Sequence, residues 1–149
     1  MKIEKFSYYS VRADDRGRFC GLTAGPQAWR EINFFYTKAG MTRGGHYADR
    51  SLELVFLMKG RVEVTLRSVV DRRDVVRLTL TPGEGVIVPP FVCRTFRYVE
   101  DGEAIACRDV PHDETGPDLP FTADADADAD DTAERPGMSA SALATPDAG

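Results

Sequence analysis

The sequence predicts an all-β fold, either a sandwich or a closed barrel, followed by an acidic tail. Up to about residue 112, short apolar runs alternate with turn signals rich in Gly, Pro and Asp, as is typical of such folds. No segment shows a convincing helical pattern. From residue 113 the hydrophobic pattern is lost. A chain of 149 residues has room for one domain.

The individual strands follow from β-prone runs and from the turns that separate them. Turns are expected at residues 14–17, 40, 59–60, 71–74 and 81–83, where Gly, Pro or clustered charges occur. The predicted strands are residues 18–22, 31–38, 52–58, 61–69, 75–80, 85–88, 92–99 and 104–110. Such short, regularly spaced strands favour a sandwich or a closed barrel.

The charge of the chain divides it into two parts at residue 113. Residues 113–149 carry ten acidic residues and one base, for a net charge of −9, which leaves +4 on residues 1–112. The stretch Thr122–Asp131 alternates Ala and Asp. Such a composition buries too little apolar area to offset its ordering entropy. We therefore expect a β domain at residues 1–112 and a disordered acidic tail at residues 113–149.

Composition also excludes several classes of function. No apolar stretch approaches the roughly 18 residues of a membrane span, and the N-terminus lacks the apolar region of a signal peptide. Cys20, Cys93 and Cys107 are scattered and form no C-x-x-C pair, which favours reduced thiols in a cytoplasmic protein. The arginines are spread along the strands, so we expect a small anionic ligand and no nucleic acid.

Two sequence motifs make the fold prediction more specific. The first runs from Gly40 to Gly60 with the pattern G-x5-H-x-A-x4-E-x6-G, which places His46, Ala48 and Glu53 at fixed spacings. The second runs from Gly83 to Tyr98 with the pattern G-x5-P-x-F-x2-R-x3-Y. Together they resemble the two motifs of the cupins, whose patterns are G-x5-H-x-H-x4-E-x6-G and G-x5-P-x-G-x2-H-x3-N. The resemblance implies a single cupin barrel, that is, a double-stranded β-helix or jelly roll.

The cupin resemblance bears on a metal. In metal-binding cupins the two His and the Glu of the first motif, with the His of the second, bind one divalent ion. Here only His46 and Glu53 remain, because Ala48 and Arg94 occupy the other two positions. We expect no metal, since Arg94 brings a permanent positive charge to the cation position. The same register predicts an interior ion pair between Glu53 and Arg94, with Phe96 and Tyr98 on the inward side with Arg94.

A narrower resemblance covers about residues 5–112. The run Asp15–Phe19, the aromatic strand before Gly40, the Arg43-Gly-Gly-His46 stretch and the Pro89-Pro90 pair resemble sugar-nucleotide 3,4-ketoisomerases and related deoxysugar-pathway (WxcM-like) cupins. That family implies a cofactor-free homodimer whose substrate is a thymidine-diphosphate 4-keto-6-deoxysugar. Ala48 departs from it, because the family typically has a second His there.

The family resemblance suggests a set of site residues. Arg43 matches a ligand-binding Arg of the family, and Arg16 matches one that lies near the nucleotide. Ketoisomerisation needs a base, a proton donor and a positive group beside the developing oxyanion. His46 is the expected base, Tyr98 or Tyr47 the donor, and Arg94 or Arg43 the oxyanion partner. The predicted catalytic residues are His46, Tyr98 and Arg94, and the predicted substrate-binding residues are Arg16, Arg43, Tyr47, Glu53 and Phe96.

Two other functions stay open at the level of sequence. One is a cofactor-free cyclase or another cupin of natural-product biosynthesis. The other is a non-catalytic cupin that binds a small molecule. The interior of the barrel discriminates between them: a wholly apolar lumen favours cyclisation, and a lumen filled by side chains favours a structural role.

Overall fold

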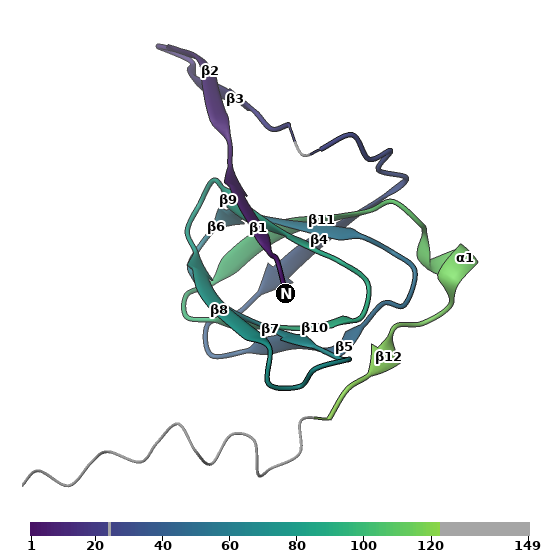
Figure 1. Cartoon of the computed structure of the whole chain (residues 1–149). Helices are drawn as coiled ribbons and strands as arrows, with labels where there is room; N and C mark the ends of the chain where they lie inside the picture. The colour runs from purple at the N-terminus through teal and green to yellow at the C-terminus, as the bar shows by residue number, and fades with distance from the viewer. Residues whose placement is uncertain (24, 123–149) are drawn as a thin grey trace, which may run out of the picture.

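The chain folds as a β-barrel of two five-stranded antiparallel sheets, shown in Figure 1 as a computed structural model that describes residues 1–23 and 25–122. The strand order is β1-β9-β6-β11-β4 in one sheet and β12-β5-β10-β7-β8 in the other. The strands of the first sheet are β1 (Glu4–Ser7), β4 (Glu31–Thr37), β6 (Glu53–Lys59), β9 (Glu84–Val88) and β11 (Gly102–Arg108). Those of the second are β5 (Thr42–Tyr47), β7 (Val62–Ser68), β8 (Val75–Leu80), β10 (Val92–Tyr98) and β12 (Leu119–Pro120).

The alternation of residues along the strands produces the core. In β7 the inward positions Val62, Val64 and Leu66 are fully buried, and Glu63 between them is exposed. Strands β9, β10 and β11 contribute further apolar side chains to the same cluster. Adjacent residues of a strand face opposite sides of the sheet. Inward positions that these apolar residues do not occupy can hold polar side chains. The inward residues of β6, β10 and β11 include Glu53, Arg94 and Arg108, and these build the site.

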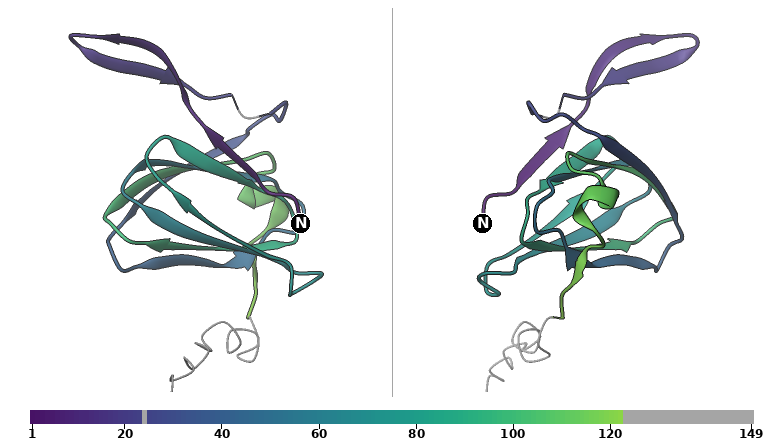
Figure 2. Two further views of the ribbon diagram at one scale, coloured as in Figure 1. Left: turned by 60° about the vertical axis from the view of Figure 1, so that its left-hand side comes forward. Right: turned by 90° about the vertical axis from the view of Figure 1, so that its right-hand side faces the viewer.

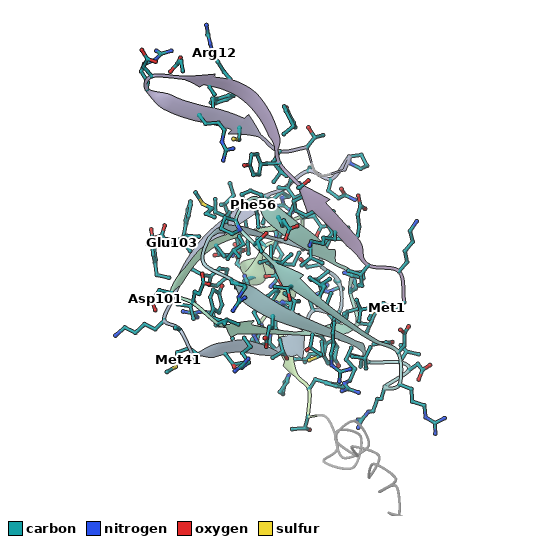
Figure 3. The ribbon with its side chains drawn as sticks, turned by 90° about the vertical axis from the view of Figure 1, so that its left-hand side faces the viewer. Met1, Arg12, Met41, Phe56, Asp101 and Glu103 are labelled. Carbon is teal, nitrogen blue, oxygen red and sulfur yellow. The ribbon has the colours of Figure 1, made fainter. Side chains whose placement is uncertain are left out.

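A two-stranded hairpin projects from this barrel. Strands β2 (Tyr9–Asp14) and β3 (Gly17–Gly21) pair only with each other among the described residues, and Figure 2 shows them extending beyond the two sheets. Arg12 lies near the far end of the hairpin (Figure 3). The turn at residues 14–17 was predicted and is present.

Most of the predicted strands are confirmed, but β1, β2, β5 and β12 were not predicted. Strand β5 contains Gly44 and Gly45, both with positive φ, and glycine pairs are more typical of turns than of strands. Gly44 is required where it lies, because a Cβ atom there would collide with the backbone oxygen of Arg94 on β10. The glycine pair therefore brings β5 close to β10 rather than ending a strand.

The boundary between barrel and tail also lies later than predicted. Residues 111–122, the C-terminal strap, contain helix α1 (His112–Thr115) and strand β12, which pairs with β5 through Leu119↔Tyr47 and Pro120↔His46. The strap packs against the barrel through the buried side chain of Asp118. A charged residue does not contribute to a hydrophobic pattern, so that pattern did not predict this contact. The predicted disorder of residues 123–149 concerns positions outside the described residues.

Candidate functional site

Strands β5 and β10 bring His46 and Arg94 side by side. The two residues are register partners in the β5–β10 ladder, next to a bulge between Arg94 and Thr95. Arg94 Nη1 donates a hydrogen bond to the His46 backbone oxygen at 3.3 Å. Arg94 is only 4% exposed, whereas the His46 side chain is 39% exposed. The guanidinium is thus fixed inside the barrel, and the imidazole lies at its rim.

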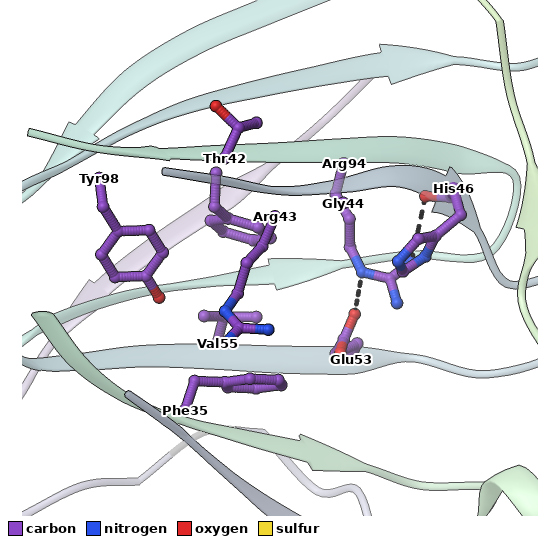
Figure 4. Close-up of a pocket in the computed structure, with 10 residues that line it drawn as sticks. Phe35, Thr42, Arg43, Gly44, His46, Glu53, Val55, Arg94 and Tyr98 are labelled. Carbon is purple, nitrogen blue, oxygen red and sulfur yellow. Dashed lines mark hydrogen bonds and ion pairs between the residues drawn. The ribbon is translucent and has the colours of Figure 1, made fainter. Parts of the chain in front are cut away.

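Glu53 reaches the same point from the opposite sheet. Its carboxylate forms an ion pair with Arg94 Nε, and both side chains are buried. Figure 4 shows this contact, with the two residues pointing toward each other from β6 and β10. The predicted interior pair is confirmed. Burial raises the pKa of Glu53, and the charges of Arg94 and Arg108 oppose that rise.

The C-terminal strap supplies a second carboxylate, Asp118, that the sequence did not reveal. Asp118 Oδ2 accepts a hydrogen bond from Arg94 Nη2 at 2.7 Å, and Oδ1 accepts one from Arg108 Nη1 at 3.0 Å. His46 Nδ1 lies 3.2 Å from Asp118 Oδ2. Burial opposes ionisation of Asp118, but its contacts with His46, Arg94 and Arg108 hold its pKa well below the usual range. Asp118 is therefore an ionised carboxylate beside the imidazole.

Two further residues support Arg108 behind this cluster. Arg108 is fully buried, and its Nε donates to Ser51 Oγ at 3.2 Å. Its Nη1 also contacts His112 Nε2, and the other ring nitrogen of His112 contacts Glu31. Burial acts to raise the pKa of Glu31, but hydrogen bonds from Asn33 and His112 outweigh this effect and lower the pKa to about 2. His112 thus joins the strap to β4 and β11.

Asp118 makes the strap a part of the folded domain, and we expect two truncations to differ sharply. Ending the chain after His112 removes the carboxylate from two buried guanidiniums and should lower the free energy of unfolding by about 2–4 kcal/mol. Ending it after Thr122 keeps Asp118 and should lower this free energy much less, by about 1 kcal/mol at most. Urea denaturation of the two truncated proteins and the full chain measures the difference. Equal stabilities would show that the strap adds nothing to the fold.

A cavity of about 260 Å³, the barrel cavity, opens beside His46 and Arg94. Its lining combines charged residues, aromatic rings and small residues: Phe35, Thr42, Arg43, Gly44, His46, Glu53, Val55, Arg94, Phe96 and Tyr98. In Figure 4 the Arg43 side chain lies between Tyr98 on one side and the Arg94–Glu53–His46 group on the other. A second cavity of about 520 Å³ shares His46, Glu53 and Arg94 and extends under the strap to His112 and Asp118.

Arg43 and Tyr98 form the other wall of the barrel cavity. Arg43 Nε donates to Thr37 Oγ1 at 2.6 Å, Nη2 donates to the Tyr36 backbone oxygen at 3.2 Å, and the guanidinium lies 5.4 Å from the centre of the Phe35 ring. Burial raises the pKa of Tyr98, against the opposing effects of Thr37 and Arg43. Tyr98 therefore keeps its proton at neutral pH, and Arg43 places a fixed positive charge beside it.

The structure brings six of the predicted site residues together and leaves two elsewhere. His46, Arg43, Glu53, Arg94, Phe96 and Tyr98 all line the barrel cavity. Tyr47 faces the other side of β5, where its ring packs near Phe91 and Phe121 at centroid distances of 6.3 and 6.4 Å. Arg16 lies on the hairpin in an ion pair with Asp14, and its side chain is 82% exposed. Within one chain, neither is placed to touch a ligand beside His46.

The donor set does not fit the divalent metal that many cupins hold. The guanidinium of Arg94 sits on the Glu53 carboxylate, so a cation there would meet a fixed positive charge. Ala48 contributes no donor atom. In the described part of the chain no three His, Cys, Asp or Glu side chains gather in a way that could hold an ion. The arrangement instead offers ionised groups of both signs around a half-buried imidazole.

The site residues that were not predicted differ in how clearly the sequence marks them. Arg108 ends a strand whose other inward positions are Gly102, Ala104 and Ala106, and a charge in that series is a signal of an interior role. Asp118 and His112 carry no such signal, because they lie in a stretch without periodicity. Only the folding of the strap against β5 places them at the site.

Comparison with known proteins agrees with this fold. Residues 12–105 match the polysaccharide biosynthesis C-terminal domain family, and the chain belongs to that family. A search of curated proteins finds no match. The barrel resembles the crystal structure of a 3,4-ketoisomerase from Helicobacter canadensis, with a TM-score of 0.65, 20% identity, and coverage of 76% of this chain and 89% of that one.

Two other solved structures extend the comparison. A sugar 3,4-ketoisomerase from Thermoanaerobacterium thermosaccharolyticum in complex with TDP gives a TM-score of 0.64 at 18% identity, covering 76% of this chain and 84% of that one. A dTDP-4-dehydrorhamnose 3,5-epimerase from Sulfolobus tokodaii gives 0.60 at 20% identity, covering 71% and 69%. These similarities establish the fold, which is the predicted cupin barrel. Within residues 1–23 and 25–122, no helix has the length and apolarity to cross a membrane.

Proposed function

We propose that the protein isomerises or epimerises a nucleotide-linked 4-keto-6-deoxysugar by acid–base proton transfer, without a cofactor. One observation carries the proposal: His46 Nδ1 lies 3.2 Å from the Asp118 carboxylate, at the edge of a cavity that also contains Arg43 and Tyr98. Similar barrels have been solved with TDP and with TDP-4-keto-6-deoxyglucose, which supports a ligand of this class.

The chemistry follows from the positions of the groups. A carboxylate beside Nδ1 favours the tautomer that carries its proton there, which leaves Nε2 as the basic nitrogen. Nε2 then removes a proton from the carbon next to the carbonyl. Negative charge develops on the carbonyl oxygen, and the fixed guanidinium of Arg43 stabilises it. Tyr98, which keeps its proton at neutral pH, is the donor to the oxygen of the enediol intermediate.

Arg94 has a supporting role in this scheme. Its guanidinium binds Glu53, Asp118 and the His46 backbone oxygen at once. Because each contact holds a neighbour of the imidazole, Arg94 positions Asp118 and neutralises two carboxylates. Arg43 takes the place of the oxyanion partner, since it lies within the open part of the barrel cavity (Figure 4).

The lumen itself argues against a cyclase and against a purely structural barrel. A cyclase that folds an apolar chain needs an apolar lumen, but this one contains Arg43, His46, Glu53 and Arg94. A purely structural barrel would be filled by side chains, whereas about 260 Å³ stays open. A non-catalytic binder of a small anion agrees with the same cavity, and turnover separates it from the isomerase.

The test is a ligand screen of the full chain followed by an assay. TDP and TDP-4-keto-6-deoxyglucose should each raise the Tm by about 5 °C or more at about a hundred times Kd, because they bind only the folded state. Thymidine and inorganic phosphate are the matched controls and should give smaller shifts. Proton NMR of the keto sugar then follows its conversion. No shift with any nucleotide would refute the substrate class, and binding without conversion would leave a binding protein.

A further inference from the structure

A separate groove lies on the outer face of the sheet that contains β5, β10, β7 and β8. It encloses about 260 Å³ and does not depend on the proposed function. Residues that point away from the barrel interior line it: Gly45, Thr65, Arg67, Arg77, Cys93, Thr95 and Phe121. Thr95, Thr65 and Arg77 are neighbours across β10, β7 and β8, and Cys93 and Arg67 form the adjacent row. We call this feature the outer groove.

The outer groove is strongly basic. Arg67 is 9% exposed, and its Nη1 donates to the Arg72 backbone oxygen at 2.7 Å. The Arg72 guanidinium lies 5.2 Å from the centre of the Phe121 ring. Arg77 lies in the groove on β8. Three guanidiniums thus gather at one end of the face, which favours an anionic occupant.

The chain itself leads an anionic segment to this groove. Phe121 lines the groove, and its backbone N–H donates to the Gly45 oxygen at 2.9 Å. Two residues further along, the sequence begins the acidic repeat, residues 123–131, which reads Ala-Asp-Ala-Asp-Ala-Asp-Ala-Asp-Asp. Its Asp residues recur at every second position, which is the period at which an extended chain places side chains on one side.

Length and tethering agree with a contact inside one chain. The ten residues that follow Phe121, up to Asp131, can span up to about 33 Å, whereas neighbouring strands lie only about 4.8 Å apart. The short link also gives the repeat a high effective concentration at the groove, so weak individual ion pairs suffice. We infer that residues 123–131 bind in the outer groove of their own chain, with their carboxylates against Arg67, Arg72 and Arg77.

Backbone NMR of two full-length variants tests this contact. In one, Asp124, Asp126, Asp128, Asp130 and Asp131 become Asn, and in the other the same five become Glu. The Asn variant should shift the amide resonances of the groove residues on β7, β8 and β10, while those of the barrel interior stay in place. The Glu variant keeps the charge and should leave the groove resonances near their wild-type positions. One molar NaCl should reproduce the Asn spectrum in the wild type, because it screens the ion pairs.

A second pair of variants changes the groove instead of the repeat. Arg77→Gln should move the resonances of residues 123–131 toward their high-salt positions. Arg61→Gln, which removes an exposed arginine paired with Glu100, should leave them unchanged. Groove resonances that are identical in the wild type and the Asn variant would overturn the inference. Shifts that grow with protein concentration would overturn it in favour of a second copy's repeat. A response to inorganic phosphate alone would overturn it in favour of a free anion.

Discussion

The substitution His46→Ala is expected to lower kcat for a TDP-4-keto-6-deoxysugar at least about a hundredfold, because it removes the general base. Stability should change by less than about 1 kcal/mol, since the His46 side chain is 39% exposed and Asp118 keeps its bonds to Arg94 and Arg108. Steady-state kinetics and urea denaturation of the same preparation measure both quantities. Affinity for TDP should stay near that of the wild type, because His46 acts on the sugar.

Two matched variants make this expectation specific. Asp118→Asn keeps the size of the side chain and removes its charge, so it should lower kcat less than His46→Ala and shift the pH profile of the rate. Tyr98→Phe removes only the hydroxyl and should lower kcat while the fold is retained. A His46→Ala variant with wild-type kcat would exclude His46 as the base. An Asp118→Asn variant with an unchanged pH profile would show that Asp118 does not position the imidazole.

The substitution Arg94→Met is expected to have the largest effect on stability, a loss of about 3–5 kcal/mol. It leaves the Glu53 carboxylate buried without its partner and removes one of two guanidiniums from Asp118. Met has a similar length and is apolar, so the volume of the barrel changes little. Urea denaturation of the variant measures the loss, with the m-value as a check that the unfolding transition stays two-state.

The matched control is the double variant Arg94→Met, Glu53→Gln. It removes the buried Glu53 charge that the Arg94→Met variant leaves without a partner. The double variant should therefore recover a large part of the lost stability. The single variant Glu53→Gln should cost less than Arg94→Met, because Arg94 retains Asp118 and the His46 backbone oxygen. A loss below about 1 kcal/mol for Arg94→Met would show that the pair is solvated rather than buried.

The part of the site that sequence predicts is the part set by local spacing. The spacing of the first motif places His46. Glu53, Arg94, Phe96 and Tyr98 lie on predicted strands whose register the two motifs define. Alternation along a strand is enough to decide that they share the barrel interior. The Glu53–Arg94 pair follows from the same reasoning. Two opposite charges at inward positions are expected to form an ion pair, because a buried charge without a partner has a large desolvation cost.

The part that sequence does not predict depends on contacts between distant segments. Asp118 reaches Arg94 and Arg108 only because the strap crosses back to pair with β5. Its immediate neighbours are Gly116, Pro117, Leu119 and Pro120, and a Gly- and Pro-rich stretch of this kind is typical of a loop or a disordered segment. Likewise, a Gly-Gly pair within a strand resembles a turn, and only the close approach of Gly44 to Arg94 explains it. Arg16 is the opposite case. It matches a position of the family motif, but the structure places it on the projecting hairpin rather than at the barrel cavity (Figure 2).

The most direct measurement of the proposed proton transfer is deuterium exchange into the substrate. The full-length protein is incubated in D2O with TDP-4-keto-6-deoxyglucose, and proton NMR follows the hydrogens on the carbons that flank the carbonyl. We expect deuterium to enter at one of these carbons in the wild type, because the half-exposed His46 exchanges its proton with solvent. The His46→Ala variant should show no exchange above the rate without protein. Retention of hydrogen at both carbons in the presence of the wild-type protein would contradict a proton-transfer site at His46.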